Sequence, residues 1–148
     1  MYQHILAAIG NSPTSDRVLK EAIGLANDQR ALLRIVYVVD EVNLYSDVQF
    51  VDRSEIEKKW IATGRKILDE AQSFARSSGV NAEVKLLATE NIGDHVASAI
   101  KKEAKDWPAD IVVAGTRGRG GLMQLLKSSV AADILSICPV PILMVRGR

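Results

Sequence analysis

The sequence predicts a three-layer α/β/α sandwich built around a five-stranded parallel sheet. Five short apolar runs alternate with four longer stretches of helical period along the 148 residues. Runs that are apolar throughout and rich in β-branched residues suit strands covered on both faces, which is how parallel sheets are built. The alternation of strand and helix in a chain of this length predicts one domain over residues 1–148.

The predicted strands are the five apolar runs. They comprise residues 5–9, 33–39, 82–88, 111–114 and 140–145. The first ends at Gly10-Asn11-Ser12-Pro13, a composition that favours a turn. The second leads into one unusually long connection, residues 40–52, at the end of a strand where open α/β sheets bind their ligands.

The stretches between the strands carry apolar residues at helical spacing. Pro13 suits the first position of the first helix, and Gly79 can take the left-handed conformation that ends the second. The third helix is expected to start near Asn91. The fourth carries apolar residues from Leu122 to Leu135 and ends before Pro139, which cannot continue it.

Charge and cysteine content exclude several classes of protein. Lys and Arg number 19 against 18 Asp and Glu, and a net charge of +1 gives no overall attraction to nucleic acid or to an anionic membrane. Cys138 is the only cysteine, which excludes an intramolecular disulfide and the spacings of zinc sites. The apolar stretch near Met1 is too short for a signal peptide or a membrane span, so we expect a cytoplasmic protein.

A glycine-rich segment follows the fourth predicted strand. It reads Gly115-Thr116-Arg117-Gly118-Arg119-Gly120-Gly121, and we call residues 115–121 the glycine segment. Glycines let successive backbone N–H groups point into one concavity, and the next helix adds the partial positive charge of its N-terminus. Arg117 and Arg119 supply donors suited to phosphate oxygens. The physical prediction is a phosphate site, with a merely flexible loop as the alternative, because the spacing matches neither the dinucleotide fingerprint nor the P-loop.

The spacing of this segment resembles the signature of the universal stress protein family. Gly115-x-x-Gly118, nine residues and Ser128-Ser129 are similar to the family's Gly-x-x-Gly, nine residues, Gly-Ser/Thr. The resemblance also covers the start, His4-Ile5-Leu6-Ala7-Ala8-Ile9, and the ending, Cys138-Pro139-Val140-Pro141-Ile142-Leu143-Met144-Val145-Arg146. It therefore spans the chain and implies a Rossmann-like fold of the adenine nucleotide alpha hydrolase type, with strand order 3-2-1-4-5.

The resemblance implies a site for an adenine nucleotide, with ATP preferred over AMP or another adenine nucleotide and Mg²⁺ left open as a companion of the phosphates. In nucleotide-binding members the ends of the first and second strands hold the adenosine, and the glycine segment with the Gly-Ser pair holds the phosphates. Asp40 is a candidate contact to the ribose, with an ordinary turn acceptor as the alternative. The implied lining is Ile9, Gly10, Val38, Asp40, Ala114, Gly115, Arg117, Gly118, Arg119, Ser128, Ser129 and Val130.

Two positions depart from the pattern of the nucleotide-binding members. Gly10 stands where those members commonly have an aspartate after the first strand, which removes a hydrogen-bond acceptor. Ser128 stands where the pair has glycine, and a left-handed backbone there would cost a serine about 1–2 kcal/mol. Each change is expected to weaken binding about tenfold or more.

Three functions follow from these features. The first is a stress-response regulator that binds an adenine nucleotide and acts as a homodimer, which the resemblance implies through the last strand, Pro139 to Arg146. The second is a slow ATPase on the same pocket, and the third is a nucleotide-free dimeric scaffold. We expect no catalytic or metal-ligating residue, because no general base is placed near Ser129 and the histidines, His4 and His95, lack partners at ligand spacing.

Overall fold

The computed structural model describes residues 1–11, 13–39, 53–89, 96–115 and 138–146. Within them five strands and three helices alternate. Their bounds are β1 (His4–Ile9), α1 (Pro13–Gln29), β2 (Leu32–Val39), α3 (Arg53–Ser77), β3 (Ala82–Ala88), α4 (Val96–Asp106), β4 (Ile111–Gly115) and β5 (Ile142–Val145). The connection 40–52, the start of the third predicted helix near Asn91 and the whole fourth predicted helix lie outside the described residues.

The strands form one parallel sheet in the order β3-β2-β1-β4-β5, which confirms the predicted topology. β1 is central and pairs with β2 along its whole length, from His4 opposite Leu32 to Ile9 opposite Tyr37. The last strand begins at Ile142, two residues later than predicted. Pro139 and Pro141 explain the delay, since proline has no N–H to donate to a sheet ladder.

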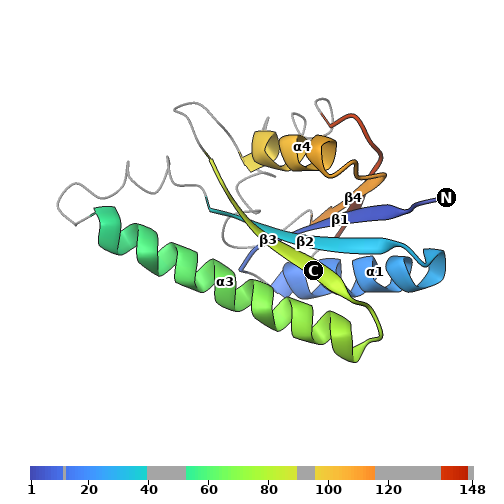
Figure 1. The fold of residues 1–148 in the computed structure, drawn as a ribbon, viewed down its shortest axis with the longest axis horizontal. Coiled ribbons are helices and arrows are strands. Elements are labelled where there is room, and N and C mark those ends of the chain that lie inside the picture. The colour runs from blue at the N-terminus through green and yellow to red at the C-terminus, as the bar shows by residue number, and fades with distance from the viewer. Residues whose placement is uncertain (12, 40–52, 90–95, 116–137, 147–148) are drawn as a thin grey trace.

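Helices cover both faces of the sheet, as a three-layer sandwich requires. Figure 1 shows α4 on one face and α1 with α3 on the other. Side chains of alternate residues in β1 belong to two separate hydrophobic cores. Those of Ile5, Ala7 and Ile9 pack toward α1 and α3. Those of Leu6 and Ala8 pack toward α4 on the other face. The sheet is therefore apolar on both faces at its centre, and this is why its strands read as unbroken apolar runs.

Helix ends follow the predicted signals. α1 begins at Pro13. Gly79 follows α3 with φ of 89°, and the N–H of Val80 donates to the carbonyl of Ala75 at 2.9 Å. This six-residue closure is the arrangement in which glycine ends a helix without steric cost.

The start of β1 is fixed by Asp110, the residue before β4. Its Oδ2 atom accepts the backbone N–H groups of Gln3 at 2.6 Å and His4 at 2.8 Å. These two hydrogen bonds, the one from Gln3 first, lower the pKa of the Asp110 carboxyl. Because that pKa is lower folded than unfolded, the contribution to stability is present above the ordinary aspartate pKa and is lost as pH falls through the folded value.

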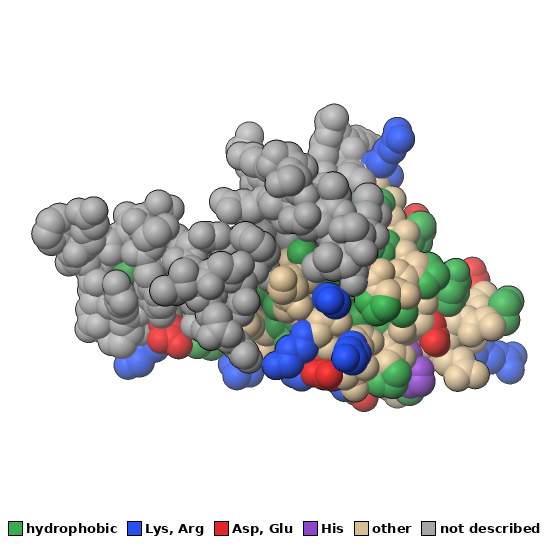
Figure 2. All heavy atoms as spheres, turned by 90° about the horizontal axis from the view of Figure 1, so that it is seen from above, with side chains coloured by type: hydrophobic (Ala, Val, Ile, Leu, Met, Phe, Trp, Pro, Cys, Tyr) green, Lys and Arg blue, Asp and Glu red, His purple; other side chains and the backbone are tan. Residues whose placement is uncertain are grey.

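A charged network covers the outer part of the sheet on the side of α4. Both oxygens of the buried Glu103 carboxylate accept hydrogen bonds, from Arg34 Nη1 at 3.1 Å and from Lys85 Nζ at 2.8 Å. Arg34 also binds Glu83 at 2.6 Å and lies 4.8 Å from the centre of the Trp107 ring. Figure 2, which looks onto this side, shows the basic side chains gathered there. Glu103 tolerates burial because both its oxygens are paired.

Gly64 of α3 lets the helix approach β2 and β3 closely. A Cβ atom at this position would lie 2.6 Å from Cδ1 of Leu86 and 3.0 Å from Cδ1 of Tyr37. Both side chains belong to the layer between the sheet and α3, so neither can move away freely. Glycine at position 64 thus sets the distance between α3 and the sheet.

Replacing Gly64 by alanine should lower the free energy of unfolding by about 1–3 kcal/mol, because the added methyl overpacks this layer. The matched control is Gly24→Ala in α1, where a Cβ atom meets nothing within 4 Å. That change should raise the free energy of unfolding by about 1 kcal/mol through helix propensity. Urea unfolding of the two variants measures both effects, and equal stabilisation by the two alanines would contradict the role of Gly64.

Candidate functional site

The predicted site residues that the structure describes are at the carboxyl ends of β1, β2 and β4. Ile9 is the last residue of β1, and Val38 lies next to the end of β2. Ala114 and Gly115 end β4, which pairs with β1. Since carboxyl ends of parallel strands share one edge, the structure brings Ile9, Gly10, Ala114 and Gly115 to neighbouring strand ends.

The remaining predicted site residues lie outside the described part of the chain. They are Asp40, Arg117, Gly118, Arg119, Ser128, Ser129 and Val130. The structure therefore describes the strand ends of the predicted nucleotide site, and the residues assigned to the phosphates stay predictions.

The turn after β1 is organised by Ser15 of α1. The buried N–H of Gly10 donates to Ser15 Oγ at 2.7 Å. Among the described residues only Arg30 and Gly79 have a positive φ, so Gly10 is in a conformation that other residues adopt. The φ angle at position 10 therefore does not itself require glycine.

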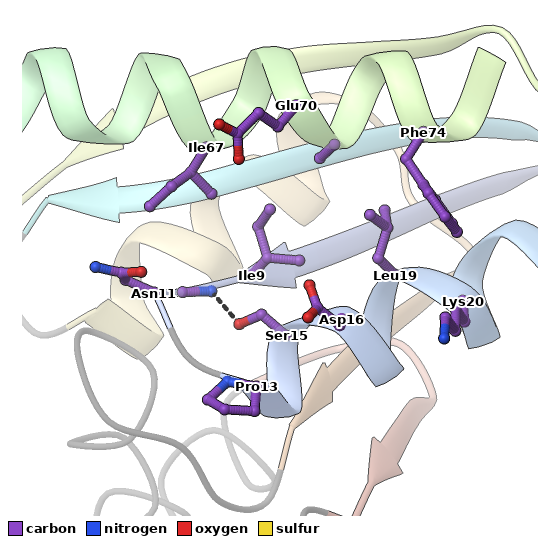
Figure 3. A pocket seen from close by; sticks show the side chains of 12 residues that line it. Ile9, Asn11, Pro13, Ser15, Asp16, Leu19, Lys20, Ile67, Glu70 and Phe74 are labelled. Carbon is purple, nitrogen blue, oxygen red and sulfur yellow. Dashed lines mark hydrogen bonds between the residues drawn. The ribbon is translucent and has the colours of Figure 1, made fainter. Parts of the chain in front are cut away.

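A cavity of about 690 Å³ opens beside this turn, between α1 and α3. Figure 3 shows Ile9 at its centre, Ser15, Asp16 and Leu19 of α1 on one side, and Ile67, Glu70 and Phe74 of α3 on the other. Its volume lies within the range of ligand pockets. Ile9 and Gly10 belong both to this cavity and to the predicted nucleotide site, and the other lining residues do not.

Sequence reasoning missed the hydrogen bond made by Ser15 and the position of Tyr37 in the core beside the end of β1. Tyr37 pairs with Ile9 in the β1–β2 register and packs in the core beneath α1 and α3, where burial raises the pKa of its phenol. A serine in the first turn of a helix after a strand was a signal for Ser15, since such a hydroxyl can reach back to the preceding backbone. In the sequence, Tyr37 is one more residue of an apolar strand. Only the pairing of β2 with β1 shows that it lies beside Ile9.

The described residues hold neither a cluster of potential metal ligands nor a helix that could span a membrane. In the ranges given above, no three His, Cys, Asp or Glu side chains come together in a way that could hold a metal ion. No helix within those ranges is both long enough and apolar enough to cross a membrane.

Comparison with known proteins assigns the family. The model of the universal stress protein family matches residues 1–146. This chain belongs to that family. It is 31% identical, over an alignment 157 positions long, to universal stress protein YxiE of Bacillus subtilis, and the alignment covers 99% of this chain and all of the relative.

Solved structures of universal stress proteins share the fold. A member from Burkholderia pseudomallei superposes with a TM-score of 0.77 at 30% identity and covers 97% of this chain and 96% of its own. The Archaeoglobus fulgidus universal stress protein in complex with dAMP has a TM-score of 0.66 at 23% identity, covering 97% and 98% of the two chains. A universal stress protein in complex with cAMP gives 0.66 at 21% identity, covering 97% and 96%.

Ser15→Ala should lower the free energy of unfolding by about 1–3 kcal/mol, because it leaves the buried N–H of Gly10 without its acceptor. Thermal unfolding of the variant measures the loss. Ser73→Ala, at an exposed position of α3, is the control and should change stability by less than about 0.5 kcal/mol. Equal stabilities of the Ser15 and Ser73 variants would contradict the role of the Gly10–Ser15 hydrogen bond.

Proposed function

We propose that this universal stress protein is a regulator that binds an adenine nucleotide, ATP in the first place, at the carboxyl edge of its sheet. The observation that carries the proposal is the juxtaposition of the ends of β1 and β4, with the glycine segment following β4 directly in the sequence. The complexes of two relatives with cAMP and dAMP support an adenine nucleotide as the ligand. In this role the chain works in the cytoplasm as one domain.

The described part of the edge fits the adenosine half of such a ligand. The side chains of Ile9 and Val38 are buried in the two cores on opposite faces of the sheet, so a ligand at this edge would meet the strand ends rather than both side chains. Gly10 and Gly115 present backbone without side chains at the strand ends. The phosphates would be held by Arg117, Gly118, Arg119, Ser128 and Ser129, with Val130 beside them, and a Mg²⁺ ion would accompany them through the phosphate oxygens. Asp40 would contact the ribose.

Two alternatives stay open for the same pocket. A nucleotide-free scaffold is favoured by Gly10 and Ser128, the two positions that depart from the pattern of the nucleotide-binding members. A slow ATPase needs a general base. A turnover assay with radiolabelled ATP measures whether the chain hydrolyses ATP. Saturable hydrolysis that disappears in the Ser129→Ala variant would show that the protein is an enzyme and would contradict a purely regulatory role.

The proposed regulator acts as a homodimer through its last strand. β5 pairs with β4 on one side and is the last strand of the sheet order, so no described strand occupies its other edge, where a strand from a second copy could pair. Leu143 is 38% exposed, a large apolar side chain at this edge. A two-fold contact between identical strands is the closed arrangement expected of such an edge.

Isothermal titration with ATP tests the nucleotide site, and Gly10→Asp sharpens the test. The wild-type chain should bind ATP saturably, and restoring a carboxylate at position 10 should increase the affinity about tenfold by returning a hydrogen-bond acceptor. Asn11→Asp is the matched control, since it adds the same charge one residue away. Absence of heat at millimolar ATP for both wild type and Gly10→Asp would end the nucleotide proposal and favour the scaffold.

A further inference from the structure

α3 carries a stripe of large apolar side chains that the fold leaves partly exposed. Trp60 is 38% exposed and Phe74 is 40% exposed, and Ile67 between them is half-buried. The three are seven residues apart, so they lie on one face of the helix and drift by only about 20° per step. A regular line of exposed apolar residues on one helix face is typical of a contact surface.

This stripe borders the cavity between α1 and α3. Ile67 and Phe74 form one wall, and Leu19 lies across from them (Figure 3). Trp60 is not part of the lining. It lies one heptad before Ile67, about 10 Å away along the helix axis. The helix therefore presents an exposed indole at one place and, at another, a cavity with mixed polar and apolar lining whose apolar part includes Leu19, Ile67 and Phe74.

We propose that a second copy of this chain docks on this groove, with its α3 antiparallel to the first and the two-fold axis beside Ile67. Because 60 and 74 are equally far from 67, this axis sets Trp60 of the partner subunit level with Phe74. The indole of each copy then enters the cavity of the other. The contact is self-complementary, as a two-fold interface must be.

The charges along the stripe suit the same arrangement. Lys66 and Glu70 are exposed on its solvent side. The axis at Ile67 sets Glu70 level with the partner's Gly64, about 3 Å along the helix from the partner's Lys66, and long side chains can span this offset to form two identical ion pairs. Lys20 of α1 and Phe74 of α3 both line the cavity (Figure 3), and Lys20 makes no ion pair with any described residue. Its ammonium can lie over the face of the incoming indole.

The contact is separate from the one proposed for β5. β5 is at one edge of the sheet, whereas α3 contacts β3 and β2 toward the other edge. A chain with two distinct two-fold contacts joins dimers into tetramers or longer arrays. One helix pair buries less than the roughly 1,200–2,000 Å² of a standard interface, so the α3 contact should form only at high protein concentration.

Cysteine cross-linking tests the position of the axis. Ile67→Cys in a Cys138→Ser background places two cysteines beside the axis, and mild oxidation should link them into a disulfide dimer. Asp69→Cys, exposed on another side of α3, is the control and should link at least about tenfold more slowly. Equal linking by the Ile67→Cys and Asp69→Cys variants, or no linking by either at millimolar protein, would overturn the proposal.

Sedimentation equilibrium of the full chain tests the energetics, with Met144→Pro added to block pairing through β5. Trp60→Ala should weaken the remaining association at least about 30-fold, as expected for a buried aromatic anchor. Lys58→Ala on the opposite side of α3 should leave it unchanged.

A charge exchange completes the test. Glu70→Lys should weaken the association, and adding Lys66→Glu should restore it. A Met144→Pro chain that stays monomeric at every concentration would overturn the α3 contact. Because the cavity and the nucleotide site share Ile9 and Gly10, ATP is titrated into the chain that carries both Met144→Pro and Trp60→Ala, so failure of one proposal is distinguishable from failure of the other.

Discussion

The structure depends on the burial of β1 on both faces and along both edges. β2 and β4 flank it, and every residue from Ile5 to Ile9 is almost completely buried. A strand in this position has no solvent-facing side, so its residues must be apolar and its backbone must be paired throughout. Asp110 holds its amino end, and Ser15 accepts a hydrogen bond from the residue that follows its carboxyl end. The register of β1 consequently fixes where the strand ends of the proposed nucleotide site lie.

The two faces of the sheet are covered by different means. Beneath α1 and α3 the cover is apolar, and Gly64 sets how close α3 comes. On the other face, α4 lies over β2 and β3, where its buried Glu103 pairs with Arg34 and Lys85. Pairing makes the burial of Glu103 tolerable, although such networks add less stability than apolar packing of the same volume. The apolar side is also the one on which a cavity and an exposed aromatic stripe remain.

The fold could be predicted from the sequence because it follows from local signals that agree with one another. Continuous apolar strands, Pro13 at a helix start and Gly79 in a left-handed helix end each have a physical meaning that does not depend on distant residues. The strand order was accessible only through the resemblance to a family. The site was predictable at its strand ends, because parallel strands place their carboxyl ends at one edge.

Other features could not be read from the sequence because they arise between elements. The cavity lies between α1 and α3, which are distant in the sequence, and the position of Tyr37 beside Ile9 depends on a register that no local pattern encodes. The pairing of Gly10 with Ser15 joins a strand end to a helix across a turn, so its geometry required the structure. The start of β5 was placed too early because the apolar character of Val140 outweighed the prolines on either side of it.

The central claim is that the carboxyl edge of this sheet holds an adenine nucleotide. The most direct measurement is mass spectrometry of small molecules released from the purified native protein, with Gly10→Asp purified in parallel. We expect an adenine nucleotide in both preparations, at higher occupancy in the Gly10→Asp protein. Absence of adenine nucleotides from both preparations, even when ATP is kept in the purification buffers and free ligand is removed just before release, would contradict it.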